Sequence, residues 1–268
     1  MTKTISVIIP AYNEESNISI LYEHLKKALD AIPHYQFELI FIDDGSTDQT
    51  LRDLQTLASH DKRVQIIQFS RNFGSHAAIA AGLTYCRGNA AVIMAADLQD
   101  PPELILELIS KYKNENYKIV WAVRKQRRGE SWYTLFLSRF YYFLMNLLTS
   151  VKQPPAGADV VLADRTVIDA FKKDPRASLS VFMSLSNLEK IQGFIEYNKK
   201  ERRRGKSGWN LRKRLNLFFN SLFCFSKIPI LSLQGKSKTT PYIIRMNTLA
   251  QNQKMNQENQ LIFNPTLN

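Results

Sequence analysis

The sequence predicts an α/β fold with a doubly wound, mostly parallel sheet flanked by helices. Five short runs are continuously apolar and rich in β-branched residues, as strands buried on both faces of a parallel sheet are. They span residues 5–10, 37–43, 64–70, 90–96 and 118–123. Helical periodicity fills the intervals, at residues 15–32, 47–60, 75–86 and 102–115. Strand and helix therefore alternate, which is typical of βαβ units.

Local signals indicate where three helices begin. Ser46 and Thr47 follow the second run, and their hydroxyls can accept hydrogen bonds from the free N–H groups of a first helical turn. The pair Pro101-Pro102 has the fixed φ that favours the start of the fourth helix. Farther along, "DVVLADRTVIDAF" predicts a strand end followed by a helix that Asp164 caps.

The composition is that of a globular protein with an uneven charge. The chain has 268 residues, of which 44% are hydrophobic and 22% are charged, and its net charge is +12. This length suits one large domain or two small ones. Residues 1–198 carry 22 basic and 22 acidic side chains, whereas residues 199–214 carry nine basic and one acidic. Such a local patch indicates an anionic partner: nucleic acid, a phosphorylated substrate or an anionic membrane.

Cysteine and histidine give no sign of a metal site or a disulfide framework. Cys86 and Cys224 are far apart and lack metal-ligand spacing, which fits a reducing compartment. His76, in "NFGSHAA", is more consistent with helix packing than with catalysis. The N-terminus turns polar too early for a signal peptide, and no run of about 18 apolar residues predicts a spanning helix.

Acidic residues follow three of the predicted strands. Glu14 follows the run at 5–10, Asp43 and Asp44 stand at the end of the run at 37–43, and Asp97 and Asp100 follow the run at 90–96. Each group alone is typical of a turn. Together they would meet at one edge of the sheet, where open α/β sheets bind their ligands. Like charges gathered there need a cation or hydrogen-bond donors, and oxygen ligands suit Mg²⁺ or Mn²⁺.

Five motifs occur along the chain in a specific order. They are "VIIPAYNEE", "FIDDGSTDQT", "SRNFG", "ADLQDPPELI" and "RRGES". In combination they closely resemble the family 2 glycosyltransferases, and within these the polyprenyl-phosphate branch of dolichyl-phosphate mannose synthase and bactoprenol glucosyl transferase. The resemblance covers about residues 4–230. It implies a GT-A fold, a nucleoside-diphosphate-sugar donor, a polyprenyl phosphate acceptor and an inverting transfer.

The resemblance also implies roles for residues of the first two motifs. Pro10, Tyr12 and Glu14 match the motif that surrounds the base and ribose of the donor. Tyr12 offers a ring face for stacking, and Glu14 offers an acceptor for a hydroxyl or ring N–H. Asp44 matches the carboxylate that reads the nucleobase edge, and the alternative is that it caps the following helix. Asp43 is expected beside it among the substrate-binding residues.

The fourth motif, "ADLQDPPELI", implies a metal site. Asp97 and Gln99 match the metal ligands, and Ala96 lies beside them among the substrate-binding residues. A metal there would bridge the two donor phosphates and neutralise charge on the leaving group. The family often has Asp-x-Asp at this place, whereas this chain has Ala95 in the first position. The expected metal site therefore has one protein carboxylate fewer, and water and phosphate oxygens complete it.

Arg124 and Asp159 match family residues near the reacting centre. Arg124 is expected to face a phosphate, or else to be an ordinary surface charge. Asp159 remains open as a base, a ligand of metal-bound water or a structural cap. A phosphate monoester has a second pKa of about 6, so the acceptor is already anionic at neutral pH and needs cations more than a base. Three basic loop residues are expected to supply them, or to bind anionic lipid headgroups: Arg202, Arg204 and Lys206.

These expectations divide the chain into three parts. Residues 1–165 form a nucleotide-sugar-binding domain, residues 166–234 an acceptor loop with membrane-interface helices, and residues 235–268 a polar tail of disordered composition. Aromatic amphipathic helices at 132–149 and 215–233 either pack in the core or lie at a membrane surface. Relatives usually continue into membrane-spanning helices where this chain becomes polar, so a naturally short form and a truncated one both remain open.

The predicted function is a metal-dependent hexosyl transfer at the cytoplasmic face of the cell membrane, with peripheral attachment. Three alternatives remain: a family 2 transferase with a polysaccharide acceptor, a donor-binding protein without turnover, and a nucleic-acid binder that uses residues 199–214. The last would show a steep salt dependence, and the acidic strand ends disfavour it. The expected partners are the sugar donor, polyprenyl phosphate and a membrane surface, without nucleic acid and with a homo-oligomer left open.

Overall fold

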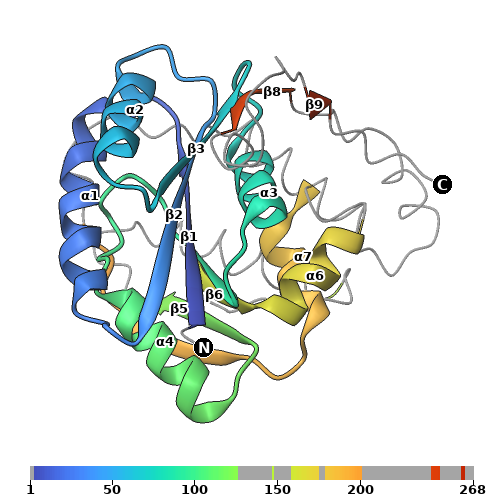
Figure 1. Cartoon of the computed structure of the whole chain (residues 1–268). Coiled ribbons are helices and arrows are strands. Elements are labelled where there is room, and N and C mark those ends of the chain that lie inside the picture. Colours follow the sequence, from blue (N-terminus) through green and yellow to red (C-terminus); the bar gives the residue numbers. More distant parts are fainter. Residues whose placement is uncertain are drawn as a thin grey trace, which may run out of the picture.

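The computed structural model describes residues 3–125, 147, 158–174, 179–200, 243–247 and 261–262. Within these residues the predicted alternation of strand and helix is confirmed. A single sheet forms the centre, and helices cover both of its faces (Figure 1). The fold is therefore α/β and doubly wound.

The sheet has nine strands in the order β7-β5-β6-β4-β1-β2-β3-β8-β9. Because β6 is antiparallel to both β4 and β5, all described strands except β6 and β8 run in the same direction. The bounds are β1 Lys3–Ala11, β2 Tyr35–Asp43, β3 Val64–Phe69, β4 Ala90–Ile93, β5 Ile119–Arg124, β6 Ala158–Asp164, β7 Gly193–Tyr197, β8 Ile243–Asn247 and β9 Leu261–Ile262.

Two layers of helices enclose the sheet. On one face lie α1 (Glu15–Asp30), α2 (Thr50–His60) and α4 (Leu104–Glu115), and on the other lie α3 (Ser75–Tyr85), α6 (Arg165–Lys173) and α7 (Val181–Leu188) (Figure 1). Strand β1 serves both layers, because successive side chains point to opposite faces. Ile9 packs toward the first layer and Ile8 toward the second. Both are fully buried, and such a side chain contributes about 1.5–3 kcal/mol.

The helix starts agree with the sequence in one case and differ in another. Asp164 caps α6, since its Oδ1 accepts a hydrogen bond from Thr166 N at 2.8 Å. The prediction that Ser46 and Thr47 cap the second helix is wrong, because α2 begins at Thr50. Both residues instead bind the loop after β1 (see below). The prolines at 101 and 102 form a turn before α4, which begins at Leu104.

The fold continues past residue 165. Helices α6 and α7 pack with α3, and β7 pairs with β5. The division into functional parts at residue 165 stays a prediction. Strands β8 and β9 fall within the predicted polar tail, whose composition indicates no strand. The predicted helix at 215–233 lies outside the described residues, as does that at 132–149 apart from Leu147. Among described helices, none has the length and apolarity needed to cross a bilayer.

Candidate active site

The described site residues lie at one edge of the sheet. Ala11 pairs with Asp43, which places the ends of β1 and β2 side by side. Strand β4 lies on the other side of β1, and the end of β5 follows beyond β6. Because β6 runs in the opposite direction, its start at Ala158 reaches the same edge. This is the carboxyl edge of the parallel strands, where open α/β sheets bind ligands.

The loops after β1 and β2 are joined by a set of hydrogen bonds. Asp44 N donates to Ala11 O at 2.9 Å, and Asn13 N donates to Ser46 Oγ at 3.0 Å. In return Thr47 N donates to Asn13 Oδ1 at 2.9 Å. Asn13 has a φ of 55°, a left-handed conformation that Asn tolerates better than most residues. The polar residues of "AYNEE" and "DDGSTD" therefore hold the two loops together, in addition to any role toward a ligand.

Asp44 binds the start of α3. Its Oδ1 accepts from Phe73 N at 2.7 Å and its Oδ2 accepts from Gly74 N at 2.8 Å. The alternative that it caps the helix that follows it is therefore wrong. Gly45 has a φ of 69°, and a Cβ there would lie 2.4 Å from the carbonyl carbon of Arg71. The "DDG" and "SRNFG" motifs thus pack directly against each other.

The other predicted donor-binding residues differ in accessibility. Tyr12 is 38% exposed, so its ring is open to a stacking partner, while Pro10 is half-buried. Glu14 is almost buried, and its Oε2 accepts from Asn17 Nδ2 at 2.5 Å. Asp43 is fully buried, and burial raises the pKa of its carboxyl group. Its Oδ1 accepts from Ser46 N, whereas its Oδ2 has no hydrogen-bond partner among the described residues.

Asp97 and Gln99 form a tight turn after β4. Gln99 N donates to Asp97 Oδ1 at 3.2 Å, and Leu98 between them has a φ of 60°. Gln99 Nε2 donates to Lys200 O at 3.3 Å, which leaves its amide oxygen available. Ala96, directly before this turn, is buried in the core layer that includes α1 and α4. Within the described ranges, no three His, Cys, Asp or Glu side chains gather as a metal site. The oxygen donors fit a hard cation that a diphosphate and water also bind.

Arg124 and Asp159 are in direct contact. Arg124 Nη2 donates to Asp159 Oδ2, and both side chains are partly buried. Ala122 pairs with Val160 and Val123 pairs with Ala158, so Asp159 is the extra residue of a β-bulge. A bulge changes the direction in which a side chain points. Here the side chain of Asp159 is directed toward Arg124 on β5. Arg124 is thus ion-paired and partly buried, and its contact with a phosphate stays a prediction.

Three further residues complete this cluster: Asp100, which the sequence analysis places among the acidic residues after the strands, and Tyr197 and Lys199, to which it assigns no role. Lys199 Nζ lies 2.7 Å from Asp159 Oδ2 and 3.3 Å from Asp100 Oδ1. Tyr197 OH donates to Asp100 Oδ1 at 2.5 Å. Burial lowers the pKa of Lys199, against the opposing effect of Asp100, and burial also raises the pKa of Tyr197. The sequence signal that could have found them is the two-residue spacing of Tyr197 and Lys199, which places both side chains on the same side of an extended segment.

Of the remaining predicted residues, Arg202, Arg204 and Lys206 lie within 201–242, which the structure does not describe, so their roles stay predictions. His76 packs between helices, as predicted. Its Nδ1 accepts from Val181 N at 3.2 Å, and its ring lies edge-on to Phe182 at 5.8 Å. Burial lowers the pKa of His76 to about 4.

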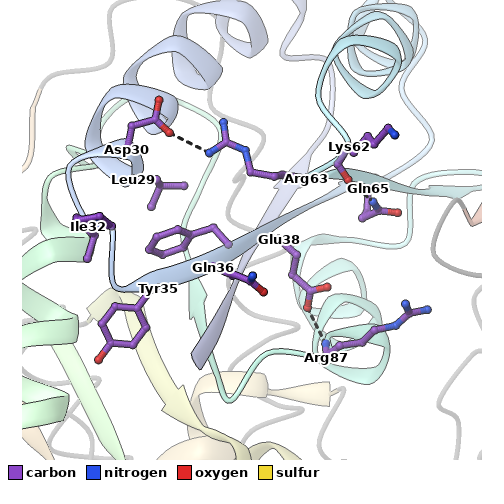
Figure 2. Close-up of a pocket in the computed structure, with 12 residues that line it drawn as sticks. Leu29, Asp30, Ile32, Tyr35, Gln36, Glu38, Lys62, Arg63, Gln65 and Arg87 are labelled. Atoms are coloured by element: carbon purple, nitrogen blue, oxygen red, sulfur yellow. Dashed lines mark hydrogen bonds and ion pairs between the residues drawn. The ribbon is translucent and has the colours of Figure 1, made fainter. Parts of the chain in front are cut away.

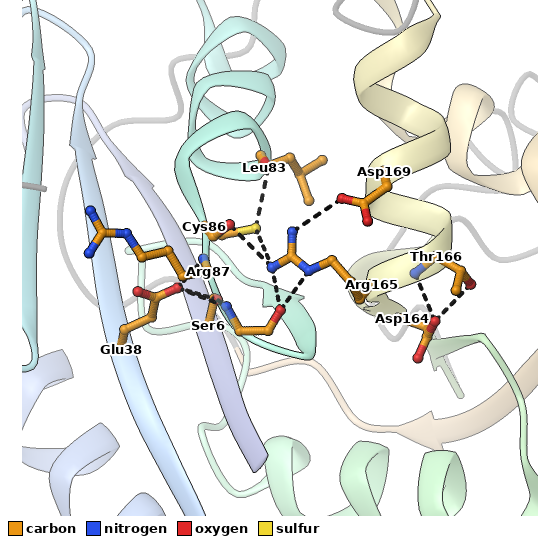
Figure 3. Close-up of polar contacts among 10 residues, drawn as sticks. Ser6, Glu38, Leu83, Cys86, Arg87, Asp164, Arg165, Thr166 and Asp169 are labelled. Carbon is orange, nitrogen blue, oxygen red and sulfur yellow. Dashed lines mark hydrogen bonds and ion pairs between the residues drawn. The ribbon is translucent and has the colours of Figure 1, made fainter. Parts of the chain in front are cut away.

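The opposite edge of the sheet carries a groove and a second polar network. The groove has a volume of about 790 Å³, and Arg63 on its wall pairs with Asp30 at 3.0 Å (Figure 2). In the network, Arg165 Nε donates to Gly88 O at 2.8 Å, and Glu38 accepts from Arg87 N at 2.6 Å (Figure 3). These polar groups bind one another and serve the fold. Cys86 beside them is buried, and burial raises the pKa of its thiol.

Comparisons with known proteins identify the family. Residues 6–172 match the model of Glycosyl transferase family 2. The uncharacterized glycosyltransferase YkcC of Bacillus subtilis is 40% identical over 225 residues, which cover 84% of this chain and 69% of that protein. The prophage bactoprenol glucosyl transferase homolog of Escherichia coli is 32% identical over 226 residues, covering 84% and 73%. The undecaprenyl-phosphate 4-deoxy-4-formamido-L-arabinose transferase of Pseudomonas syringae is 29% identical, covering 88% and 70%.

Solved structures agree with the fold. The mannosyl-3-phosphoglycerate synthase from Rubrobacter xylanophilus has a TM-score of 0.58 at 14% identity, covering 88% of this chain and 77% of that chain. The glucosyl-3-phosphoglycerate synthase from Mycobacterium tuberculosis, crystallised with Mn²⁺, UDP-glucose and phosphoglyceric acid, has a TM-score of 0.56 at 18% identity, covering 89% and 82%. With its GT-A fold, the chain belongs to glycosyl transferase family 2, in the polyprenyl-phosphate branch.

Proposed function

We propose that this glycosyltransferase moves a hexose-type sugar from a nucleoside diphosphate to polyprenyl phosphate, with inversion at the anomeric carbon. Two relatives are named for transfer to bactoprenol or undecaprenyl phosphate, and their similarity spans most of this chain. The carboxyl edge supports this proposal because it has two chemically different sides. The loops after β1 and β2 suit a nucleoside, and the cluster around Asp159 suits the reacting groups.

The observation that carries the proposal is the pairing of Arg124 and Lys199 with one carboxylate oxygen of Asp159. A carboxylate that already accepts from two cations is arranged as a counter-ion and not as a proton acceptor. A phosphate acceptor needs no such base, since it is ionised near neutral pH. A sugar hydroxyl of a polysaccharide would need one. The cluster therefore favours a phosphate acceptor over a hydroxyl acceptor.

The reaction is then a single displacement. An oxygen of the acceptor phosphate attacks the anomeric carbon, and the bond from that carbon to the diphosphate oxygen breaks with its electron pair going to the nucleoside diphosphate. No proton is transferred, so the chain has to align the two substrates and stabilise charge. Asp97 and Gln99 would hold Mg²⁺ or Mn²⁺, which when bound neutralises charge on the diphosphate.

Beyond the described residues, the basic loop is proposed to bind the acceptor phosphate. Arg202 and Arg204 offer the forked donors that suit phosphate oxygens, and Lys206 adds a third cation. The same charges would attract an anionic membrane by about 1 kcal/mol each. We place the protein at the cytoplasmic face of the membrane on this basis, where the lipid chain of the acceptor remains in the bilayer.

The test is lipid-dependent nucleotide release. Purified protein receives UDP-glucose, UDP-GlcNAc, UDP-galactose or GDP-mannose with Mn²⁺ or Mg²⁺, with and without undecaprenyl phosphate in detergent. Release that requires the lipid, is lost in Asp97→Ala and persists in Glu23→Ala supports the proposal and names the sugar. Glu23 is a matched control because it is an exposed carboxylate on α1.

A second outcome is favoured by one feature of the chain. Ala95 stands where the family often has a carboxylate, and a weakened metal site could leave donor binding without turnover. Donor binding by calorimetry without nucleotide release would support that reading. Neither binding nor release with any donor would overturn the proposed function.

A further inference from the structure

The ammonium group of Lys199 lies between carboxylates from two different parts of the sheet. Its Nζ is 3.3 Å from Asp100 Oδ1, in the loop after β4, and 2.7 Å from Asp159 Oδ2, on β6. The side chain of Lys199 is 13% exposed, and that of Asp100 is fully buried. Charges removed from water in this way need a partner, because an isolated buried charge costs several kcal/mol. Strands β4 and β6 are hydrogen-bonded neighbours, but their last paired residues are Ile93 and Val161, so the ammonium joins two carboxylates that lie beyond this pairing.

The extended chain after β7 delivers Lys199 to this place. Lys125 N donates to Tyr197 O at 2.8 Å, which continues the pairing of β7 with β5 at its end. Tyr197 and Lys199 are two residues apart, so their side chains point to the same side of the extended segment. Tyr197 OH and Lys199 Nζ consequently bind the same carboxylate, that of Asp100.

The next residue of this segment binds a predicted metal ligand. Lys200 N donates to Gln99 O at 2.9 Å, and Gln99 Nε2 donates to Lys200 O at 3.3 Å. The segment 197–200 thus contacts the loop 97–100 through the Asp100 carboxylate and through the Gln99 main chain and amide. The same segment reaches Asp159 through Lys199 alone.

We propose that Lys199 is a positioning residue for the sugar transfer, supported by Tyr197. By binding Asp100 and Asp159 together, it sets the distance between the loop that carries Asp97 and Gln99 and the ion pair of Asp159 with Arg124. In the proposed function, that loop holds the donor diphosphate and that ion pair faces the reacting groups. The inference therefore rests on the proposed function. Lys199 acts through the carboxylates, because its three N–H donors face three carboxylate oxygens: Asp159 Oδ2 at 2.7 Å, Asp100 Oδ1 at 3.3 Å and Asp100 Oδ2 at 3.5 Å.

The experiment compares Lys199→Met, Lys199→Arg and Tyr197→Phe with the unaltered protein. Lys113→Met is the matched control, because Lys113 is an exposed lysine on α4, away from the carboxyl edge. For each protein, kcat and the KM of donor and of polyprenyl phosphate are measured with saturating Mn²⁺. Donor affinity is measured by calorimetry, and the folded fraction is measured by thermal unfolding.

The expected result for Lys199→Met is a loss of about 10²-fold in kcat, as for a small misplacement of reacting groups, with both KM values nearly unchanged. Lys199→Arg should recover about tenfold of that loss because it keeps the charge. Tyr197→Phe should lower kcat by a few-fold. Lys113→Met should match the unaltered protein, and donor affinity should stay within about threefold throughout.

Three results would overturn the inference. A folded Lys199→Met protein whose kcat is within twofold of the unaltered value would show that Lys199 positions nothing. A raised acceptor KM with an unchanged kcat would show that Lys199 binds the substrate directly. If Lys199→Met does not fold, an unchanged kcat in Tyr197→Phe decides against the role. Absence of transfer by the unaltered protein overturns the proposed function first, and the role of Lys199 with it.

Discussion

Arg124 at the end of β5 and Asp159 near the start of β6 form an ion pair across a β-bulge, although 35 positions separate them in the sequence. The pair exists because β6 runs against β5 and because the bulge turns the Asp159 side chain toward its neighbour. The two residues that follow Asp159 are Val160 and Val161, and both are buried in the core. The cations that pair with Asp159 therefore come from other parts of the chain, as Arg124 and Lys199.

This relationship predicts the effect of removing Arg124. Arg124→Met should lower kcat for sugar transfer by about 10²-fold, the usual loss for one group that stabilises charge in the transition state. Arg124→Lys should retain part of the activity, since a lysine keeps the charge but loses the planar fork. Steady-state kinetics with polyprenyl phosphate measure both effects. Arg52→Met, an exposed arginine on α2, is the control. If Arg124→Met were as active as the control, Arg124 would have no role in the sugar transfer.

The metal requirement can be tested in two directions. Asp97→Asn should raise the Mn²⁺ concentration for half-maximal activity by at least about tenfold, because a neutral amide is a poorer ligand than a carboxylate. Ala95→Asp restores the carboxylate that the family often has and should lower that concentration. Activity titrated with Mn²⁺ after EDTA treatment gives both values. If Asp97→Asn leaves the Mn²⁺ titration unchanged, Asp97 is not a metal ligand.

The fold was largely predictable because the chain repeats one simple pattern. The runs at 5–10 and 37–43 are apolar on both faces, and the structure places them at the centre of the sheet as β1 and β2. Strand β8 was not predictable from composition. Its pairing partner β3 is remote in the sequence, so its formation depends on tertiary contacts.

The location of the candidate site could be predicted from the sequence, but the contacts between its residues could not. Residues after strands must meet at the carboxyl edge of a parallel sheet, so Asp44, Asp97 and Arg124 could be placed there from order alone. The bulge at Asp159 and the approach of Lys199 depend on strand register, which the sequence does not reveal. Similarly, the hydroxyl of Ser46 can accept a hydrogen bond either from the start of the next helix or from the loop after β1. In the structure it accepts from Asn13 N in that loop.

His76 predicts a pH dependence of folding stability. Burial lowers its pKa in the folded protein to about 4, below the value of about 6.5 in an unfolded chain. The neutral ring is therefore favoured by folding, and its contribution is complete above pH 6.5 and is lost as the pH falls toward 4. The free energy of unfolding should drop by about 1–2 kcal/mol between pH 7 and pH 5. Urea unfolding at both values measures the drop, which His76→Gln should largely abolish. An equal drop in that variant would assign it to other groups.

Two glycines allow backbone strain to be separated from close packing. Gly45 and Gly74 both have a positive φ, 69° and 98°, but a Cβ at Gly45 would lie 2.4 Å from the Arg71 backbone, whereas at Gly74 it meets nothing within 4 Å. Gly74→Ala should cost only the strain, about 1–3 kcal/mol. Gly45→Ala should cost more and should also weaken donor binding, because the "SRNFG" loop must move away from Asp44. Chemical unfolding and calorimetry with the nucleotide sugar compare the two variants. Equal costs would mean that the contact between the two motifs is not as close as the structure has it.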